Sequence, residues 1–227
     1  MLILALDAAL ARCSVALLRN DTVLAERHHD AARGHAAMLP PMAEAVLAEA
    51  GVPASALAAV AAVVGPGGFT GIRCALALAE GIALGAGIPV IGVSTGEALA
   101  EAIPLEQRAG REVWTAIDNR RGRIVLQRFA ADGLLSLSLS LGLPLGPPEA
   151  LEEAALPHPG QPVAVAGDAA PQLCARLAAR GVNVLLSAAR LPDAAAAARV
   201  ARRRLAGALP PLDARPLYIE PPAVRLR

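Results

Sequence analysis

Short apolar runs alternate with turn residues along the first part of the chain, and this pattern predicts strands. The dipeptide Asn20-Asp21 separates two of these runs and is typical of a tight turn between antiparallel strands. The first three strands should therefore pair as a β-meander. The expected strands cover residues 2–8, 13–19, 22–28, 58–64 and 89–93.

Between the strands, apolar residues recur at helical spacing. A helix is expected over residues 34–50, where Pro40 and Pro41 should kink the helix or delay its first turn. A second helix, over 70–86, joins the two flanking strands into a β-α-β unit. A third helical segment covers residues 94–102.

A polar stretch near residues 104–112 interrupts this pattern and predicts a boundary between two lobes, 1–104 and 105–227. In the second lobe, Asp193 should cap a long helix. The proline-punctuated tail from Leu212 onward is expected to pack extended, back on the first lobe. The expected strands here cover 112–118, 123–130, 134–139 and 163–166, and the expected helices cover 171–179 and 193–209.

The two lobes begin alike. Residues Leu4 to Asp7 and residues Thr115 to Asp118 are each an aliphatic strand that ends on an aspartate, followed by a short turn and a second apolar strand. This echo indicates an internal duplication. Two such lobes are typical of the actin-like (ASKHA, RNase H-like) ATPase fold, an α/β fold with mixed sheets, and we expect the second lobe to be the smaller or degenerate one.

The composition limits the chemistry. All 21 basic residues are arginine, and arginine neither loses its proton readily nor forms an imine. This excludes a Walker A lysine, a Schiff-base lysine and a kinase-type phosphate lysine. The net charge of +1 gives no overall field that would gather nucleic acid.

Cysteine usage and the N-terminus favour a cytoplasmic protein without membrane contact. Cys13, Cys74 and Cys174 are widely spaced, which argues against a disulfide framework and a thiolate metal site. The opening residues lack the basic region of a secretory signal, and no uninterrupted apolar run is long enough to span a bilayer.

A glycine-rich segment, Gly65-Pro66-Gly67-Gly68-Phe69-Thr70-Gly71, lies between an expected strand and helix. Exposed backbone N–H groups at such a turn can bind phosphate, and Thr70 could cap the helix. Glycine at this kind of turn can also simply relieve backbone strain. The candidate phosphate-binding residues are Gly65, Gly67, Gly68 and Thr70.

The strand-end aspartates Asp7 and Asp118 are candidate partners of a nucleotide. Facing a cleft, they could hold magnesium through water or take part in acid-base chemistry. Alternatively, each carboxylate caps its hairpin turn. The sequence leaves both interpretations open.

Other polar clusters have simpler explanations. His28, His29 and His35 are close in sequence, but adjacent histidines on a strand point to opposite faces, so we predict no metal site. The arginines of the segment 199–204 could bind phosphates of tRNA directly, or they complement the dipole at the end of a helix.

The two long N-terminal helices are apolar nearly all round. Only Glu44 and Glu49 are charged between residues 36 and 50, and only Arg73 and Glu80 between 71 and 86. A surface helix should have one polar face, so we expect a partner subunit to cover the side turned away from the sheet. The predicted partner-binding residues are His35, Met38, Leu39, Met42, Val46, Ile72, Leu76, Ala79 and Ala83.

The motifs together resemble the TsaB family, also called YeaZ. The segment 65–73 is similar to that family's GPGSFTGxR signature, and Ile3 to Asp7 and Ile88 to Thr95 are similar to flanking strands. In the second half, 116–120 and 216–219 match less distinctively. The resemblance implies a dimer formed through helices, with a second copy or with the ATPase subunit TsaD. With TsaD and TsaE, such proteins modify tRNA.

The sequence departs from the family pattern at several positions, and these departures argue against catalysis by this chain. Thr95 and Leu99 stand where TsaD has two metal-binding histidines. Ala8 replaces the threonine usual after the first aspartate, Gly68 replaces the serine of the signature, and Glu220 replaces an arginine. We therefore expect no tightly bound cofactor here, with ATP and a metal ion on the TsaD-like partner.

The resemblance implies a noncatalytic partner subunit. Such a subunit is required for transfer of threonylcarbamoyl from threonylcarbamoyl-AMP to N6 of adenosine-37, in tRNAs that read codons beginning with adenine. The alternative is a stand-alone actin-like ATPase or M22-type peptidase that uses Asp7 and the loop 65–71.

Overall fold

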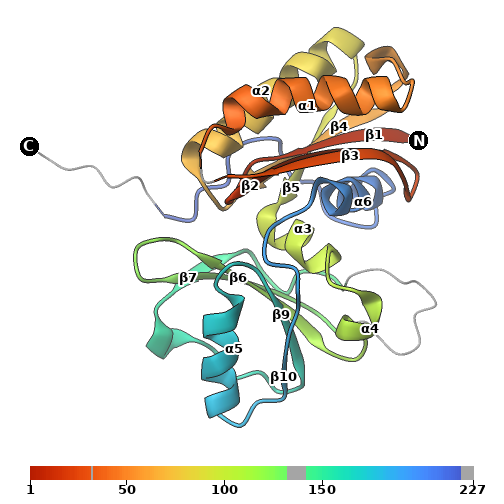
Figure 1. The fold of residues 1–227 in the computed structure, drawn as a ribbon. Helices are drawn as coiled ribbons and strands as arrows, with labels where there is room; N and C mark the ends of the chain where they lie inside the picture. The colour runs from red at the N-terminus through yellow and green to blue at the C-terminus, as the bar shows by residue number, and fades with distance from the viewer. Residues whose placement is uncertain (32, 132–141, 221–227) are drawn as a thin grey trace, which may run out of the picture.

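Two five-stranded mixed sheets, one in each lobe, organise the structure (Figure 1). It is a computed structural model that describes residues 1–31, 33–131 and 142–220. The first sheet has the order β3-β2-β1-β4-β5, in which β1 to β3 are antiparallel and β4 and β5 run parallel to β1. Its strands are β1 (Leu2–Asp7), β2 (Arg12–Arg19), β3 (Thr22–Asp30), β4 (Ala59–Gly65) and β5 (Val90–Ser94).

The second sheet repeats this topology. Its order is β8-β7-β6-β9-β10, with β6 antiparallel to β7 and parallel to β9. Strand order and direction match the first sheet strand for strand, which confirms the predicted internal repeat and the two-lobed α/β fold. The strands are β6 (Glu112–Asp118), β7 (Ile124–Phe129), β8 (Glu149–Leu151), β9 (Val163–Ala166) and β10 (Val184–Leu186).

Helices cover both faces of the first sheet. In Figure 1, α1 and α2 lie on one face and α6 lies on the other, while α3 lies between the two sheets and α5 packs on the second sheet. The helices are α1 (His35–Glu49), α2 (Phe69–Ala86), α3 (Thr95–Glu101), α4 (Leu105–Arg108), α5 (Ala170–Ala179) and α6 (Ala194–Leu205), with 3-10 turns η1 (Ala54–Ala56) and η2 (Glu153–Ala155).

Small aliphatic residues let these helices lie close to the sheets. Every residue of β4 is buried, and α2 packs on it through Ala75, Ala79 and Ala83. Pro40 and Pro41 lie inside α1, which begins at His35, so the prolines do not delay the start of the helix.

The end of the chain belongs to the first lobe, which corrects the expected second lobe of 105–227. Helix α6 packs on β1, β2, β4 and β5, and its alanines join the first hydrophobic core. The Leu217 N–H then donates to the Val64 carbonyl at 2.8 Å. The tail from Leu212 was expected to return to the first lobe, but α6 was assigned to the second, because a lobe that is completed by a distant segment leaves no local boundary signal.

Helix α6 is held by polar contacts at both ends. Asp193 caps it as predicted, accepting from the Ala195 N–H at 2.7 Å. Near its other end, Arg204 forms a buried ion pair with Glu97 of α3 at 2.6 Å and donates to the carbonyls of Gly92 and Pro210. The last turn of α6 is therefore fixed between α3 and β5.

Most expected elements are present, with bounds that differ by a few residues. Three short ones, β8, β10 and α4, were not expected, because three or four residues carry too little periodicity. The expected strand at 134–139 lies outside the described residues.

Candidate functional site

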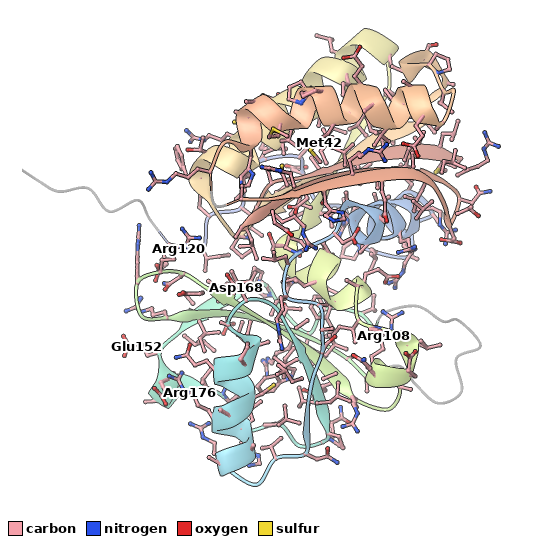
Figure 2. All side chains as sticks on the ribbon, in the orientation of Figure 1. Met42, Arg108, Arg120, Glu152, Asp168 and Arg176 are labelled. Carbon is pink, nitrogen blue, oxygen red and sulfur yellow. The ribbon has the colours of Figure 1, made fainter. Side chains whose placement is uncertain are left out.

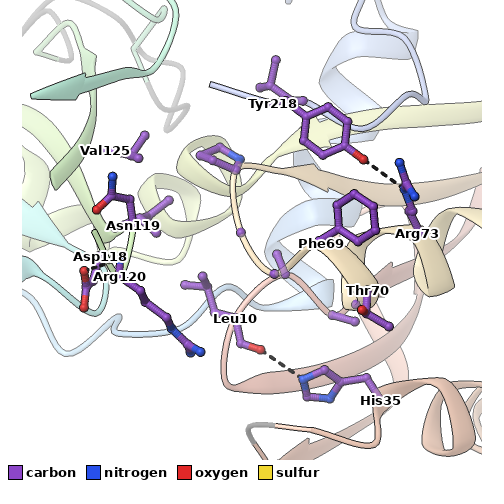
Figure 3. A pocket seen from close by; sticks show the side chains of 18 of the residues that line it. Leu10, His35, Phe69, Thr70, Arg73, Asp118, Asn119, Arg120, Val125 and Tyr218 are labelled. Atoms are coloured by element: carbon purple, nitrogen blue, oxygen red, sulfur yellow. Dashed lines mark hydrogen bonds between the residues drawn. The ribbon is translucent and has the colours of Figure 1, made fainter. Parts of the chain in front are cut away.

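A cleft of about 870 Å³ lies between the two lobes. One wall comes from the turn after β1, the start of α1, the glycine-rich loop and the start of α2. The other comes from the β6–β7 turn and Asp168, and the tail borders both walls, because Tyr218 contacts Arg73 and Glu220 contacts Arg123. Figure 3 shows these elements facing one another, with Thr70 and Arg73 on one side and Asp118 to Arg120 on the other.

The glycine-rich loop packs directly against the turn after β1. The Gly68 N–H donates to the Ala9 carbonyl at 2.7 Å. A Cβ on Gly67 would lie 2.3 Å from that carbonyl oxygen, and one on Gly71 would lie 2.0 Å from the Ala8 oxygen. Gly67 and Gly71 are therefore required because the backbone of another segment lies too close for a side chain, which supports the structural interpretation of these glycines. The Gly68 N–H is already hydrogen-bonded and is not available to bind a phosphate.

The loop also corrects the expected role of Thr70. Helix α2 begins at Phe69, so Gly68 is the N-cap residue and no side chain caps the helix. Thr70 is exposed in the first turn instead. Gly65, at the other end of the loop, adopts a φ of +111°, which side chains of L-residues rarely allow.

The two strand-end aspartates do not meet in the cleft. Asp7 is fully buried and is not among the cleft-lining residues. Its Oδ1 accepts from the Ala9 N–H at 3.0 Å, and its Oδ2 has no hydrogen-bond partner among the described residues. Burial raises the pKa of Asp7 to about 7. The expectation that Asp7 faces the cleft is therefore wrong.

Asp118 does line the cleft, as expected. Its Oδ1 accepts from the Arg120 N–H at 2.7 Å, in the turn-capping role that the sequence left open. The Asp118 N–H in turn donates to Asp168 Oδ1 at 2.9 Å, and burial raises the pKa of Asp168. Asp168 follows β9, which runs parallel to β6, so both carboxylates meet at one sheet edge, and Figure 2 labels Asp168 there.

Three residues at the cleft edge were missed by sequence reasoning. The Arg73 guanidinium lies over the Phe69 ring, with Cζ 3.7 Å from its centroid, and Nε donates to the Tyr218 hydroxyl at 3.0 Å (Figure 3). Phe69 and Tyr218 are both about half exposed. The two aromatic residues are far apart in sequence, so no periodic pattern connects them.

Thr95 and Leu99, where the sequence resemblance led us to expect no metal ligands, have structural roles. The Thr95 hydroxyl donates to the Pro66 carbonyl at 2.7 Å, and Leu99 is fully buried. Within the part of the chain that the structure describes, no group of three or more His, Cys, Asp or Glu side chains is arranged to hold a metal ion.

Most of the predicted partner-binding residues face the core of the first lobe in the isolated chain. Eight of the nine are buried in the first lobe, and only Met38 is partly exposed. Met42, for example, points from α1 toward the sheet (Figure 2) and contacts Cys13 with 3.9 Å between the sulfur atoms. The buried residues are His35, Leu39, Met42, Val46, Ile72, Leu76, Ala79 and Ala83.

The opposite side of α2 is apolar and exposed. Leu84 is 86% exposed, and Leu78 and Ile82 are partly exposed. By length and composition α2 could even cross a membrane, but its inner side packs on β4 and α1, as in a core helix. We call the residues Ala77, Leu78, Gly81, Ile82, Leu84 and Gly85 the outer face of α2.

Three of the four arginines of α6 form ion pairs within the chain. Arg202 pairs with Asp21 at 2.8 Å, Arg203 with Glu101 at 3.7 Å, and Arg204 with Glu97. Arg203 and Arg204 are largely buried. These contacts favour a structural role over direct tRNA binding through this helix.

The repeated sheets and the cleft between them define a protein of the actin-like ATPase fold. The same fold relates the chain to the ethanolamine utilization protein EutJ from Carboxydothermus hydrogenoformans, at a TM-score of 0.51 and 13% sequence identity. Such a likeness describes the architecture alone.

Sequence comparison narrows this class to one family. Residues 26–135 match the family model described as TsaD, tRNA N6-adenosine threonylcarbamoyltransferase. The tRNA threonylcarbamoyladenosine biosynthesis protein TsaB of Escherichia coli is 39% identical over 133 residues, 58% of this chain and 56% of that protein. An uncharacterized protein of Mycobacterium tuberculosis is 34% identical over 167 residues, 73% of this chain and 71% of that protein.

Solved structures agree over nearly the whole length. A Pseudomonas aeruginosa protein described as similar to peptidase YEAZ has a TM-score of 0.80 at 28% identity, covering 96% of this chain and 99% of that one. YeaZ from the same organism has a TM-score of 0.76 at 29% identity, covering 94% and 97%. The chain belongs to the TsaB/YeaZ family. In sequence, however, it aligns with little more than half of the Escherichia coli protein.

Proposed function

We propose that this chain is a noncatalytic partner subunit in the biosynthesis of threonylcarbamoyladenosine in tRNA. It docks a TsaD-like ATPase subunit through the outer face of α2 and the adjoining surface of α1, and a TsaE-like ATPase joins the complex. The complex transfers threonylcarbamoyl from threonylcarbamoyl-AMP to N6 of adenosine-37 in the cytoplasm. ATP and a metal ion are held by the TsaD-like subunit.

The observation that carries this proposal is the composition of the outer face of α2. Gly81 and Gly85 lie inside the helix, where each glycine costs about 1 kcal/mol relative to alanine. A Cβ at either position would meet nothing within 4 Å, so the fold itself does not require glycine there. Close approach of a helix from a partner subunit would require glycine at these two positions.

The spacing of these residues fits a helix partner. Ala77, Gly81 and Gly85 recur at every fourth position and so share one side of α2. Leu84 lies beside them, and burying a fully exposed leucine contributes about 1.5–3 kcal/mol. Glu80 is the only charged residue between Cys74 and Gly87. A row of small residues flanked by leucine suits a tightly packed helix pair.

The cleft supports the noncatalytic part of the proposal. Asp7 is buried away from the cleft, and the Gly68 N–H is bonded to Ala9. The stand-alone ATPase or M22-type peptidase alternative needs Asp7 and this loop at the surface. Thr95 and Leu99 offer no imidazole for a metal, so the chemistry is assigned to the partner.

Copurification tests the docking surface. The chain is coexpressed with the tagged TsaD-like subunit from the same organism, as wild type, as Leu84→Glu and as Leu186→Glu. Leu186 is an exposed leucine of β10 in the second lobe and serves as the matched control. We expect the wild type and Leu186→Glu to copurify and Leu84→Glu to be lost, because a carboxylate would be buried in the interface.

Two results would contradict the proposal. One is that Leu84→Glu copurifies as well as the control and restores threonylcarbamoyladenosine to tRNA in cells that lack the chain. The other is that Leu84→Glu changes only the sedimentation of the isolated chain, from dimer to monomer. The second result would assign the outer face of α2 to a homodimer instead.

A further inference from the structure

The placement of the aromatic side chains is unusual for this composition. The sequence contains one tryptophan, one tyrosine and two phenylalanines. Trp114 and Phe129 are fully buried in the second lobe, but Phe69 is 55% exposed and Tyr218 is 49% exposed. These two rings lie together at the cleft edge, with centroids 6.0 Å apart and planes at 21°. Two exposed, stacked rings in so aromatic-poor a chain indicate a binding role.

Arg73 holds this pair in place. Its guanidinium lies over the Phe69 ring and its Nε donates to the Tyr218 hydroxyl. The contact ties the tail to the start of α2, although 145 residues separate Arg73 from Tyr218. The rings are therefore positioned by the fold while remaining accessible, as a stacking platform for planar groups must be.

Arginine side chains from both lobes line the cleft. Arg33 and Arg73 belong to the first lobe, and Arg120 and Arg121 belong to the β6–β7 turn of the second. Figure 3 shows Arg73 and Arg120 on opposite sides of the cleft. Because the four arginines are spread along two walls, they suit several phosphates in a row better than one phosphate.

The acidic side chains of the cleft form ion pairs or hydrogen bonds within the chain. Glu220 pairs with Arg123 at 2.8 Å and lies 3.6 Å from Arg121. Asp168 accepts the Asp118 backbone N–H, and Asp118 accepts the Arg120 N–H through Oδ1, which leaves Oδ2 of Asp118 to accept from a base amino group or a ribose hydroxyl. His35 is a buried side chain at the cleft. Its Nε2 lies 3.1 Å from the Leu10 carbonyl oxygen, and its Nδ1 has no hydrogen-bond partner among the described residues.

We propose that this cleft binds the unpaired bases of an RNA loop, with Phe69 and Tyr218 stacking on bases and the arginines contacting the phosphates. The inference rests on the proposed function in tRNA modification and assigns this chain a direct share in recognising the RNA. A free nucleotide fits less well, because the Gly68 N–H of the would-be phosphate loop is bonded to Ala9.

Fluorescence anisotropy of the full isolated chain tests this inference. The probe is a fluorescein-labelled RNA hairpin with an unpaired loop, and the competitors are AMP and the same RNA annealed into a complete duplex. The variants are Phe69→Leu, Arg120→Gln and, as the matched control, Arg19→Gln. Arg19 is an exposed arginine at the end of β2 opposite the cleft, where it pairs with Leu2 in the sheet register.

We expect the hairpin to bind and the duplex to compete poorly, because its bases are not free to stack. Phe69→Leu should weaken binding roughly tenfold without changing the salt dependence, since only stacking is lost. Arg120→Gln should lower the slope of log affinity against log salt by about 0.7, one phosphate contact on a single strand. Arg19→Gln should match the wild type.

Several results would overturn the inference. They are an absence of hairpin binding, equal affinity of Phe69→Leu and wild type, equal competition by the duplex, and full displacement by AMP, which would indicate a mononucleotide site. Copurification with the TsaD-like subunit is measured on the same variants. If partner binding persists while RNA binding is absent, only this inference fails. If the wild type does not bind the partner, the proposed function fails.

Discussion

The two lobes share one sheet topology but differ in the helices that cover it. Helix α2 follows β4 and leads into β5, and α5 occupies the equivalent place between β9 and β10. Helix α2 has 18 residues and an exposed apolar side, whereas α5 has 10 residues. The counterpart of α1 in the second lobe is only the 3-10 turn η2.

This difference locates the interaction surface. In the second lobe, α5 packs on one face of the sheet and α3 on the other. On α5, Arg176 pairs with Glu153 at 2.7 Å, as on an ordinary surface helix. Single leucines of the second lobe, such as Leu186, are also exposed, but the long exposed apolar helix side belongs to the first lobe, on the side of α2 that faces away from the sheet.

The first strands of the lobes show a second difference. Asp7 and Asp118 occupy equivalent strand ends, yet Asp7 is fully buried and Asp118 is exposed in the cleft. Helix α6 packs on β1 and β2, and its first N–H, from Ala194, donates to the Ser14 hydroxyl at 3.0 Å. Ser14 pairs with Asp7 in the sheet. Asp118 stays exposed, although α3 packs on β6 and β7.

The largest expected effect tests whether the end of the chain completes the first lobe. Arg204→Ala removes a cation that is 6% exposed and leaves Glu97, equally buried, without its partner. We expect a loss of about 3–5 kcal/mol in the free energy of unfolding. In the control, Arg202→Ala, the exposed pair with Asp21 is broken and the loss should stay below about 1 kcal/mol. Urea titration measures both, and equal losses would refute the structural role of Arg204.

The next effect tests the contrast between the aspartates. The pKa of Asp7 is about 7 when folded, against an ordinary value of 3.8. The folded state therefore holds this proton more tightly, and stability falls as the pH rises from the unfolded pKa through the folded one. Asp7→Asn should add about 4 kcal/mol to the free energy of unfolding near pH 8, and roughly half of that gain should be gone near pH 5.

Asp118→Asn is the control for this experiment. Because Asp118 is exposed, its substitution should not reproduce the gain of about 4 kcal/mol near pH 8. Thermal melts across the pH range would reveal the difference. If both variants followed the wild-type pH curve, Asp7 would not be the buried acid described here.

The smallest effect compares two glycines of α2. Gly71→Ala should cost about 1–3 kcal/mol of stability, because its Cβ would overlap the Ala8 carbonyl. Gly81→Ala should instead raise the stability of the isolated chain by about 0.5–1 kcal/mol through helix propensity, since its Cβ meets open space. The same substitution should weaken binding of the TsaD-like subunit. An alanine that stabilises the chain and leaves partner binding intact would argue against close helix approach.

Much of the fold could be predicted because its signals are local. The aspartate at each first strand end predicted the duplicated topology, and the apolar spacing predicted α1 and α2. The burial of Asp7 could not be predicted, because it depends on α6, whose residues follow far later in the chain. The return of the tail to the first lobe was expected. The stacking of the Tyr218 ring on the Phe69 ring could not be predicted, because no sequence pattern connects the two residues.

The burial of most predicted interface residues could not be foreseen for a different reason. In an alanine-rich helix the inner and outer sides have nearly the same composition, so periodicity does not distinguish buried Ala79 from exposed Ala77. Leucine and methionine attract attention as contact residues, yet here most of them form the core. Gly81 and Gly85, by contrast, look like weak points of a helix until the empty space beside them is known.

Hydrogen–deuterium exchange of the chain, with and without the TsaD-like subunit, tests the central claim most directly. It compares the equivalent helices α2 and α5 in one experiment and needs no substitution. We predict that peptides covering Phe69–Ala86 and His35–Glu49 gain protection on complex formation, while the peptide covering Ala170–Ala179 exchanges as before. Protection confined to the second lobe, with α2 unchanged, would contradict the account.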